Sequence, residues 1–512
     1  MISKNLKTIL ILSLISLVGL FWSLYHIEFG LPHSFHADEP EITELAIKYT
    51  FEFKDVVKSN NYYKLIPVSY VYGALPSYIF TIATMIFTKS LNIFGISFDK
   101  TTLFIYMRVV NVLLSFLIAP LAAFLYFKVF KDRAGTILTF FLVALNWKFI
   151  VHAHYVNADT LLTLLVLAAI TCAYFYSQSD FENKYTILCG IFMGLAIGTK
   201  ITAGLSLIPF AYLYFRKKDL VGFTGLILTI LLFFMLSNPF AIIFHGDFVS
   251  RIYQLEFKEN GLVFDSADAN PLKYILALIF IATPLVAVIS LYGKFVVIKF
   301  SDAKTKDFHI FLLANIAVYL AFFSLSSRNV DRWLLPIIPV VLIYAAYGLV
   351  KLKSWLLIFV DLASYMILPA LLLLQFQVNT PKSSAYLWMQ KNVPQFSTKY
   401  VVTEEGLDPM NKLQFARVHK FNVYESDNAQ LDFPPDPSLY NYVVLSSKPM
   451  DYYKNPIVKQ KYPFYFAQWQ GFENKVTNSQ NFELVQSFVL PKPNLVNLSD
   501  VFIYKNIQKT FK

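Results

Sequence analysis

The sequence predicts a polytopic α-helical membrane protein with a small α/β domain at its C-terminal end. Of its 512 residues, 56% are hydrophobic and only 15% are charged, whereas soluble domains carry roughly 25% charged residues. Apolar runs long enough to cross a bilayer recur up to residue 376, and a crossing helix needs about 20 residues. From about Pro381 onward the composition becomes that of a soluble domain.

The first apolar run, Thr8 to Tyr25, follows Lys4 and Lys7 as a signal peptide would. No small-x-small cleavage site follows it, so we expect it to be retained as the first helix. Ten further runs are expected to be transmembrane helices, at 103–127, 134–151, 160–177, 186–199, 201–215, 220–243, 272–293, 308–326, 333–350 and 354–376. The sequence therefore predicts about eleven crossings, of which 186–199 and 201–215 form a tight hairpin around Lys200.

Basic clusters between these runs predict the orientation. They are "KVFKDR" (128–133), "RKKD" (216–219), "KFSDAKTKD" (299–307) and "KLK" (351–353). An even number of runs separates each cluster from the next, so all four can lie on the cytoplasmic side, where Lys and Arg accumulate. The N-terminus is then inside, and everything after residue 377 is outside. Counting 72–95 as a crossing would break this pattern, so we expect it to be an interfacial helix on the outer leaflet.

The chain divides into a transmembrane domain, 1–378, and an extracytoplasmic C-terminal domain, 379–512. In the second domain, "SSAYLWMQKNVP" (383–394) has the Ser start and Pro stop of a short helix. The segments "KYVVTEEG", "NYVVLSSK" and "DVFIYK" are typical of strands. About 130 residues suffice for one small α/β domain.

The composition also excludes some functions. The net charge is +11, but the basic residues largely fall in clusters between apolar runs, so nucleic acid is not an expected partner. Cys172 and Cys189 both lie in apolar segments and support neither a disulfide framework nor a zinc site.

Carboxylates and cations gather in the segments predicted to face outward. The candidates are His36, Asp38, Glu39, Arg108, His154, Asp159, Lys200, Arg328 and Arg332. A carboxylate can accept the proton of an attacking hydroxyl, and Arg or Lys can hold a departing phosphate. This mixture favours transfer of a group from a membrane lipid phosphate to a hydroxyl. Plainer explanations are a solvated acidic loop, an arginine that reaches the lipid headgroups, and an Asp159 that only caps a helix.

A metal site is the alternative for His152, His154 and Asp159, whose side chains are potential ligands. Alternate histidines do not share a helix face, so we expect no metal and no other cofactor, with a divalent cation as the less favoured possibility.

The order of these motifs resembles that of the GT-C transferases that use polyprenyl- or dolichyl-phosphate sugars. Their members include the protein O-mannosyltransferases and the lipid A aminoarabinose transferases. The resemblance covers about residues 30–345. It rests on "ADEPEITELA" (37–46), the Arg-led helix of 106–138, "HYVNADTLLTLLVLA" (154–168), "GIFMGLAIGTKITAGLSLIPF" (190–210) and "SRNVDRWLLPIIPV" (327–340).

The resemblance implies roles for individual residues. Asp38 matches the general base, Glu39 its acidic neighbour and Asp159 the second acidic position. Lys200 matches the lysine of the Thr-Lys turn and Arg108 the helix-leading arginine. Together with Arg328, Arg332, His36 and His154, these two cations are expected to bind substrate.

Two departures from the motifs of the aminoarabinose transferases narrow the range of expected substrates. Where the aminoarabinose transferases have an arginine two residues after Asp-Glu, this chain has Glu41, and where they have Lys-Pro it has "YGALP" (72–76). Both missing cations are associated with the lipid phosphate, so a lipid A substrate is not expected.

We therefore expect an inverting glycosyltransferase of the plasma membrane. Its donor is a polyprenyl-phosphate sugar, and its acceptor is a hydroxyl of a protein, lipid or polysaccharide. One alternative is an oligosaccharide transferase or ligase that takes a pyrophosphate-linked glycan, and a second is a lipid or sugar transporter. Transporters are often built from paired repeats, and the sequence shows none. A third alternative is an inactive scaffold.

Overall fold

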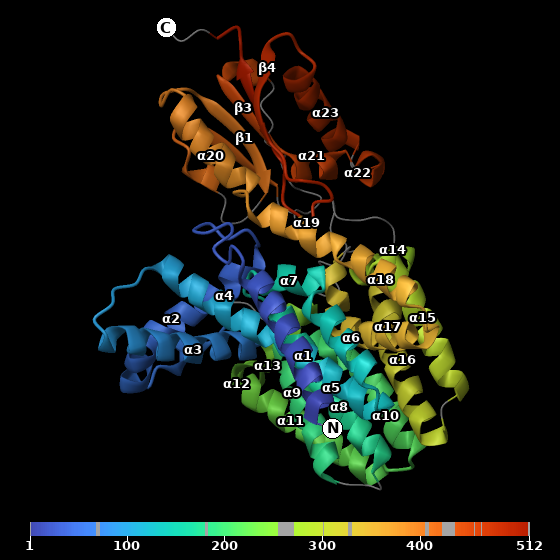
Figure 1. Ribbon diagram of the computed structural model, residues 1–512. Coiled ribbons are helices and arrows are strands. Elements are labelled where there is room, and N and C mark those ends of the chain that lie inside the picture. The colour runs from blue at the N-terminus through green and yellow to red at the C-terminus, as the bar shows by residue number, and fades with distance from the viewer. Residues whose placement is uncertain are drawn as a thin grey trace.

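A computed structural model describes residues 2–67, 72–179, 183–253, 271–300, 302–325, 330–404, 409–421, 436–454, 456–461 and 463–509. A bundle of helices carries a sheet domain at one end, and the N-terminus lies toward the other end (Figure 1). The bundle contains α1 Ile2–Leu24, α4 Lys100–Phe116, α5 Ile118–Phe130, α6 Arg133–Ala144, α7 Trp147–Ala153, α8 Ala158–Gln178, α9 Asn183–Thr199, η2 Ile201–Ser206, α10 Leu207–Arg216, α11 Leu220–Ser237, α12 Pro239–Ile243, α13 His245–Tyr253, α14 Pro271–Ala282, α15 Pro284–Phe300, α16 Ala303–Ser324, η4 Asp331–Ile337, α17 Ile338–Leu352, α18 Trp355–Tyr365 and α19 Ile367–Phe376.

The described residues include eight helices long and apolar enough to cross a membrane, or ten if each of two bent pairs is one span. This is fewer than the eleven crossings expected. The run expected at 134–151 is α6 and α7, bent by 48°, and the run at 272–293 is α14 and α15, bent by 100°. The second bend falls at Thr283, which has φ +69°, directly before Pro284, whose ring cannot continue the hydrogen bonds of a helix.

Helix α8 connects the end of the bundle that carries Asp159 with the end that carries the basic clusters. Its 21 residues span about 30 Å, the thickness of the hydrocarbon core. Near its C-terminal end, Tyr174 donates a hydrogen bond to the Lys128 carbonyl and Tyr176 donates one to Asp219. Arg216 contacts Asp307 at 3.3 Å. Three of the four basic clusters therefore meet at one end of the bundle.

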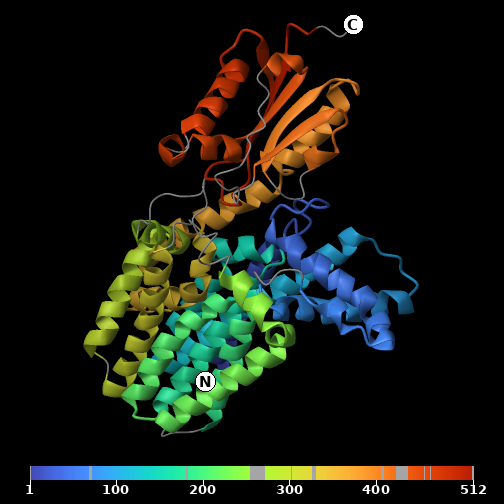
Figure 2. The same cartoon turned by 180° about the vertical axis from the view of Figure 1, so that it is seen from behind.

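Helices α2 (Asp38–Ser59) and α3 (Ala74–Ile93) pack together and project from the side of the bundle, with η1 (Tyr62–Leu65) between them in the chain (Figures 1 and 2). By length and composition α3 could cross a membrane, but it lies crosswise to α1 (Figure 1). That arrangement is the one expected of an interfacial helix at 72–95.

The C-terminal elements are α20 Pro381–Asn392, β1 Lys399–Glu404, η5 Pro409–Lys412, β2 Ala416–Phe421, η6 Pro437–Leu439, β3 Tyr442–Ser446, α21 Ser447–Tyr453, α22 Pro456–Lys461, α23 Pro463–Thr477, β4 Phe482–Phe488 and β5 Val501–Asn506. The sheet order is β2-β1-β3-β5-β4, with β1 parallel to β2 and β3 and with β5 antiparallel to β3 and β4. The predicted helix and three strands correspond to α20, β1, β3 and β5.

Alternate side chains of β1 pack against helices on opposite faces of the sheet, so both faces are covered. Tyr400 and Val402 pack with Trp469 of α23, whereas Val401 packs with Met389 of α20. Successive strand residues point to opposite faces, so the sheet lies between these two helices (Figure 1).

Gln375 of α19 ties the sheet domain to the bundle. Its fully buried amide donates to the carbonyls of Pro491 at 2.6 Å and Pro493 at 2.5 Å, and accepts from the Leu495 amide at 3.1 Å. Leu490 and Leu495 also pack into the hydrophobic core of the bundle.

Candidate active site at one end of the bundle

The acidic motif of the first loop begins helix α2. Asp38, Glu39 and Glu41 occupy its first turn, where the positive end of the helix dipole favours carboxylates. His36 lies just before the helix, and its Nδ1 accepts a hydrogen bond from the Asp38 amide at 3.2 Å. The His36 ring stacks on Tyr155, with centroids 4.1 Å apart. The start of α2 is therefore held by a ring stack and a backbone hydrogen bond.

Four charged side chains from four segments form one connected cluster, which we call the ionic cluster: Asp38, Asp159, Lys200 and Arg332. Arg332 Nη2 lies 2.8 Å from Asp38 Oδ2, and Arg332 Nε lies 3.3 Å from Asp159 Oδ2. Lys200 Nζ lies 2.8 Å from Asp159 Oδ1. The structure thus brings together residues from α2, α8, the end of α9 and η4.

The local backbone structure orients Asp159 and Lys200 toward the ionic cluster. Asn157 caps α8 by accepting from the Thr160 amide at 3.1 Å, which leaves Asp159 in the first turn, free to pair with cations. Lys200 has an extended backbone after the last residue of α9, so its side chain turns toward the α8 terminus. The Asp159 side chain is 1% exposed, against 24% for Arg332. The cluster is therefore open on the arginine side.

The environment fixes the charge state of Asp38. Burial raises the pKa of its carboxyl, but Arg332 and other neighbours outweigh burial and hold the pKa well below its usual range. Burial lowers the pKa of His36 to about 4, and the positive charges of Arg332 and Lys448 act in the same direction. At neutral pH Asp38 is ionised and His36 is neutral, so His36 Nδ1 can accept the Asp38 amide hydrogen.

Glu39 and Arg108 lie apart from the ionic cluster. They form a bidentate ion pair with two contacts of 2.7 Å, and both side chains are fully buried. Arg108 Nη1 also donates to the carbonyls of Ile27 and Phe29, and Glu39 accepts from Ser34 and from the Val156 amide. This arrangement braces the first loop against α4 and leaves neither side chain open to a substrate.

The remaining predicted residues are also accounted for. His154 stacks on Phe376 at 3.8 Å, and both of its ring nitrogens face carbonyl oxygens at 2.8 Å, so it packs inside the protein rather than in the ionic cluster. Arg328 lies outside the described residues. No group of three or more His, Cys, Asp or Glu side chains that could hold a metal occurs within the described ranges. His152 Nδ1 instead faces the Tyr155 hydroxyl at 2.7 Å.

Tyr72 also contacts the ionic cluster, although the sequence does not single it out. Its hydroxyl hydrogen-bonds Asp38, and its ring lies 5.7 Å from Lys200 Nζ. Burial and the Asp38 charge raise the pKa of Tyr72 well above its usual value, so its hydroxyl keeps its proton and donates. The only signal in the sequence is its place at the start of "YGALP".

An ion pair that the sequence does not reveal lies beside Arg332. Lys148 of α7 contacts Asp331 at 2.7 Å, and the Lys148 side chain is only 9% exposed. Lys148 falls within an apolar run, so the charged residues of the predicted loops do not include it. Because Asp331 is the neighbour of Arg332, this ion pair holds the segment that carries the arginine.

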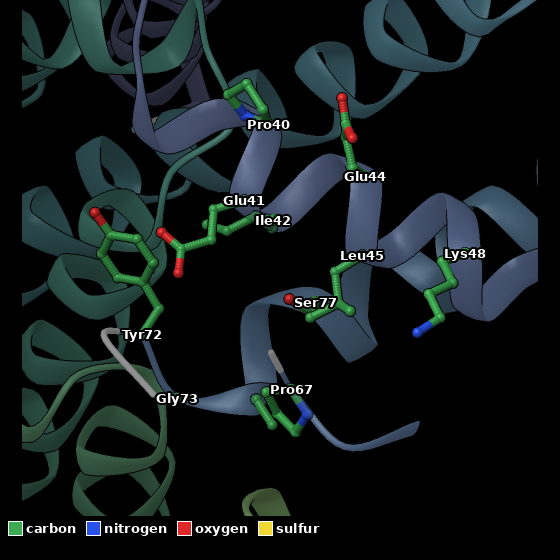
Figure 3. Close-up of a pocket in the computed structure, with 11 residues that line it drawn as sticks. Pro40, Glu41, Ile42, Glu44, Leu45, Lys48, Pro67, Tyr72, Gly73 and Ser77 are labelled. Carbon is green, nitrogen blue, oxygen red and sulfur yellow. The ribbon is translucent and has the colours of Figure 1, made fainter. Parts of the chain in front are cut away.

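A pocket of about 490 Å³ is lined in part by Tyr72, the residue that hydrogen-bonds Asp38 of the ionic cluster. It lies between α2 and α3, and Tyr72 stands at its edge with the Glu41 carboxylate pointing toward it (Figure 3). Its other lining residues are Pro40, Ile42, Glu44, Leu45, Lys48, Pro67, Gly73, Ala74 and Ser77. The pocket thus combines apolar side chains with Glu41, Glu44 and Lys48, and Tyr72 links it to Asp38.

Comparisons with known proteins bear on the fold and on the family. The profile of the family described as dolichyl-phosphate-mannose-protein mannosyltransferase matches residues 85–245, which include Asp159 and Lys200. A search of the curated proteins finds no match.

Two solved structures have similar folds over almost their whole length. ArnT from Cupriavidus metallidurans bound to undecaprenyl phosphate is 12% identical, with 97% of each chain covered and a TM-score of 0.55. The same protein in the apo state is 13% identical, with 98% of each chain covered and a TM-score of 0.54. These findings confirm the predicted fold class. The family profile and the fold together confirm the resemblance of this chain to the GT-C glycosyltransferases that use lipid-phosphate sugars.

Proposed function

We propose that this chain transfers a sugar from a polyprenyl-phosphate donor to an acceptor hydroxyl, and that the ionic cluster is its reaction centre. The observation that carries the proposal is the position of Arg332 between Asp38 and Asp159, with Lys200 on the far carboxylate oxygen. One ionised carboxylate, Asp38, is then linked to two cations through Arg332 and Asp159. Transfer from a phosphate ester to a hydroxyl needs these groups together.

In the proposed reaction Asp38 is the general base. The acceptor oxygen attacks the anomeric carbon from the side opposite the phosphate, and its proton passes to Asp38. The bond between the anomeric carbon and the phosphate oxygen breaks, and the electron pair leaves with the polyprenyl phosphate. Lys200 and Arg332 hold the negative charge that develops there, and the sugar inverts its configuration.

Binding of the donor strengthens the base. Arg332 is the neighbour that lowers the pKa of Asp38 most. A phosphate that binds Arg332 shares its positive charge, so less of that charge acts on Asp38. The pKa of Asp38 then rises, and the carboxylate becomes a better proton acceptor when the donor is present.

The other predicted residues act by positioning in this proposal. Asp159 holds Lys200 and Arg332, while His36 holds the start of α2. Glu39 and Arg108 brace the loop that ends at Asp38.

The pocket between α2 and α3 is the proposed place for the donor, since it adjoins Tyr72 and has an apolar floor. A structure with the same fold binds undecaprenyl phosphate, which supports a polyprenyl-phosphate donor. The sheet domain lies at the same end of the bundle: His33 of the first loop contacts Tyr386 of α20, with ring centroids 6.4 Å apart. We propose that this domain helps to hold the acceptor.

The proposed location is the plasma membrane, with the ionic cluster and the sheet domain on the extracytoplasmic side. Asp159 lies in the first turn of α8, whereas Tyr176 near its end donates to Asp219 in a basic cluster. Basic clusters are retained on the cytoplasmic side. The opposite end of this membrane-length helix would then face outward.

A transfer assay tests the proposal. The purified full chain is incubated with dolichyl- and undecaprenyl-phosphate-linked hexoses and pentoses carrying radiolabelled sugar, together with hydroxyl acceptors (a Ser/Thr peptide, a membrane lipid and a polysaccharide). Transfer of the labelled sugar and release of free polyprenyl phosphate are both measured. We expect at least one donor to be cleaved, with EDTA present, and expect Arg216→Gln, in a basic cluster at the other end of the bundle, to retain the activity. The absence of cleavage with every donor would contradict the proposal. Movement of an uncleaved donor between leaflets would indicate a transporter. Cleavage that EDTA abolishes would favour the oligosaccharide transferase or ligase, which is expected to need a divalent metal.

A further inference from the structure

A junction of backbone contacts lies behind the ionic cluster, where α3, α9 and α11 meet. The Gly73 amide donates to the Thr199 carbonyl at 3.0 Å. The Ala74 amide donates to Asn238 Oδ1 at 2.7 Å, and Asn238 Nδ2 donates to the Gly198 carbonyl at 3.0 Å. Asn238 lies between α11 and α12 and is 3% exposed. One side chain therefore bridges the start of α3 and the end of α9.

Each end of this bridge is one or two residues from a side chain that belongs to the ionic cluster or hydrogen-bonds to it. Gly73 follows Tyr72, whose hydroxyl hydrogen-bonds Asp38. Gly198 and Thr199 precede Lys200, which pairs with Asp159. The Tyr72 ring and Lys200 Nζ are themselves 5.7 Å apart. The junction thus sets the distance between a group that orients the base and a group that holds the phosphate.

The backbone lies too close to its neighbours at Gly73 and Gly198 for a side chain at either position. A Cβ atom on Gly73 would lie 1.8 Å from the Gly198 carbonyl oxygen, and one on Gly198 would lie 2.0 Å from Ser237 Oγ. These distances are below any van der Waals contact, so Gly73 packs directly on the backbone of α9, and Gly198 packs directly on Ser237 of α11. A change at Asn238 therefore reaches Tyr72 and Lys200 with no flexible side chain between them to absorb it.

We propose that Asn238 is a positioning residue, which fixes Tyr72 and Lys200 for binding of the donor phosphate. The inference rests on the proposed function, because it assumes that Lys200 holds that phosphate. A purely structural role for Asn238 would instead stabilise the bundle without affecting the phosphate in particular. The two roles differ in their dependence on Lys200.

A double-mutant cycle on ligand binding separates them. Undecaprenyl phosphate and its neutral alcohol, undecaprenol, are titrated onto the purified full chain and onto Asn238→Ala, Lys200→Met and the double variant. Loss of a charge-assisted contact should weaken binding of undecaprenyl phosphate about 10-fold or more in Lys200→Met. We expect a similar loss in Asn238→Ala, little further loss in the double variant, and undecaprenol affinities that stay unchanged throughout.

Other outcomes of the cycle would contradict either the role of Asn238 or the role of Lys200. Equal loss from Asn238→Ala in both backgrounds, or equal loss for the phosphate and the alcohol, would overturn the positioning role while leaving Lys200 in place. Unchanged affinity in Lys200→Met would overturn the proposed function at Lys200 and the inference with it.

One further variant serves as a control, and a second replaces Asn238→Ala if that variant does not fold. Asn506→Ala removes a buried asparagine that donates to the carbonyls of Ser438 and Tyr440 in the sheet domain, and it should bind both lipids as the unmodified chain does. If Asn238→Ala does not fold, Asn238→Ser takes its place, since one hydroxyl can replace only part of the bridge. The serine variant should show the same selective loss for undecaprenyl phosphate, and an equal loss for both lipids would overturn the inference.

Discussion

Arg332 contacts Asp38 at 2.8 Å and Asp159 at 3.3 Å, so one guanidinium joins two carboxylates that lie 121 positions apart in the chain (159 − 38). The Arg332 side chain is 24% exposed, whereas that of Asp159 is 1% exposed. The arginine is therefore the part of the ionic cluster that an incoming anion meets first. Its removal should affect both the phosphate and the base.

The first prediction concerns Arg332→Gln. We expect transfer to fall about 10²–10³-fold, the usual loss when one donor to a developing charge is removed. Asp38 must be ionised to accept a proton, so activity is lost as the pH falls through its pKa. Arg332 lowers that pKa and burial raises it. Without the arginine, the acidic limb of kcat/KM should move to higher pH by about 1 to 3 units.

The pH profile of kcat/KM for the variant and the unmodified enzyme checks this shift. Arg216→Gln is the matched control, because Arg216 is an exposed arginine of a basic cluster at the other end of the bundle. An acidic limb that stays in place in Arg332→Gln would show that the arginine does not control Asp38.

The second prediction concerns the buried pair Glu39 and Arg108, both with 0% exposed side chains. Removing one partner leaves an uncompensated buried charge, which costs about 3–5 kcal/mol of unfolding free energy. Glu39→Gln and Arg108→Met should each destabilise the protein strongly. The double variant should lose less than the sum of the two, because it leaves no unpaired charge.

Denaturant unfolding of the four proteins in mixed micelles measures these free energies. Additive losses would mean that the two side chains do not act as a pair, and the bracing role proposed for them would then be wrong.

The third prediction concerns Gln375, whose amide makes three hydrogen bonds to the segment 491–495. Each such bond contributes roughly 0.5–1.5 kcal/mol. Gln375→Ala should loosen the sheet domain from the bundle, so limited proteolysis should cleave the connecting segments faster. Gln390→Ala is the control, since the Gln390 amide makes an exposed hydrogen bond to Tyr386 within α20. Equal cleavage rates for the two variants would contradict the role of Gln375.

Much of the fold was predictable because membrane proteins follow simple rules. Apolar runs and basic clusters indicated the helices, and β1, β3 and β5 carry the Val- and Tyr-rich pattern of strands. Bends were harder to predict, because hydrophobicity does not reveal that Thr283 and Pro284 turn the chain by 100°. The strands β2 and β4 were missed because a sheet can recruit segments with a weak pattern of their own.

The site was predictable in part. Asp38, Asp159, Lys200 and Arg332 do lie together, as expected of polar residues at one end of a bundle. Adjacent residues on a helix point about 100° apart, so Asp38 can face the open cluster while Glu39 faces α4, and a sequence does not reveal which acid takes which direction. Tyr72 could not be identified because a tyrosine at a membrane interface is ordinary.

The most direct test of the central claim is sugar transfer by Asp38→Asn, measured together with binding of undecaprenyl phosphate. The amide has the same shape but cannot accept a proton, so we expect transfer to fall by about 10²-fold or more. Binding of undecaprenyl phosphate should be retained, because Lys200 and Arg332 remain. A variant that transfers sugar at the rate of the unmodified enzyme would contradict the assignment of Asp38 as the base.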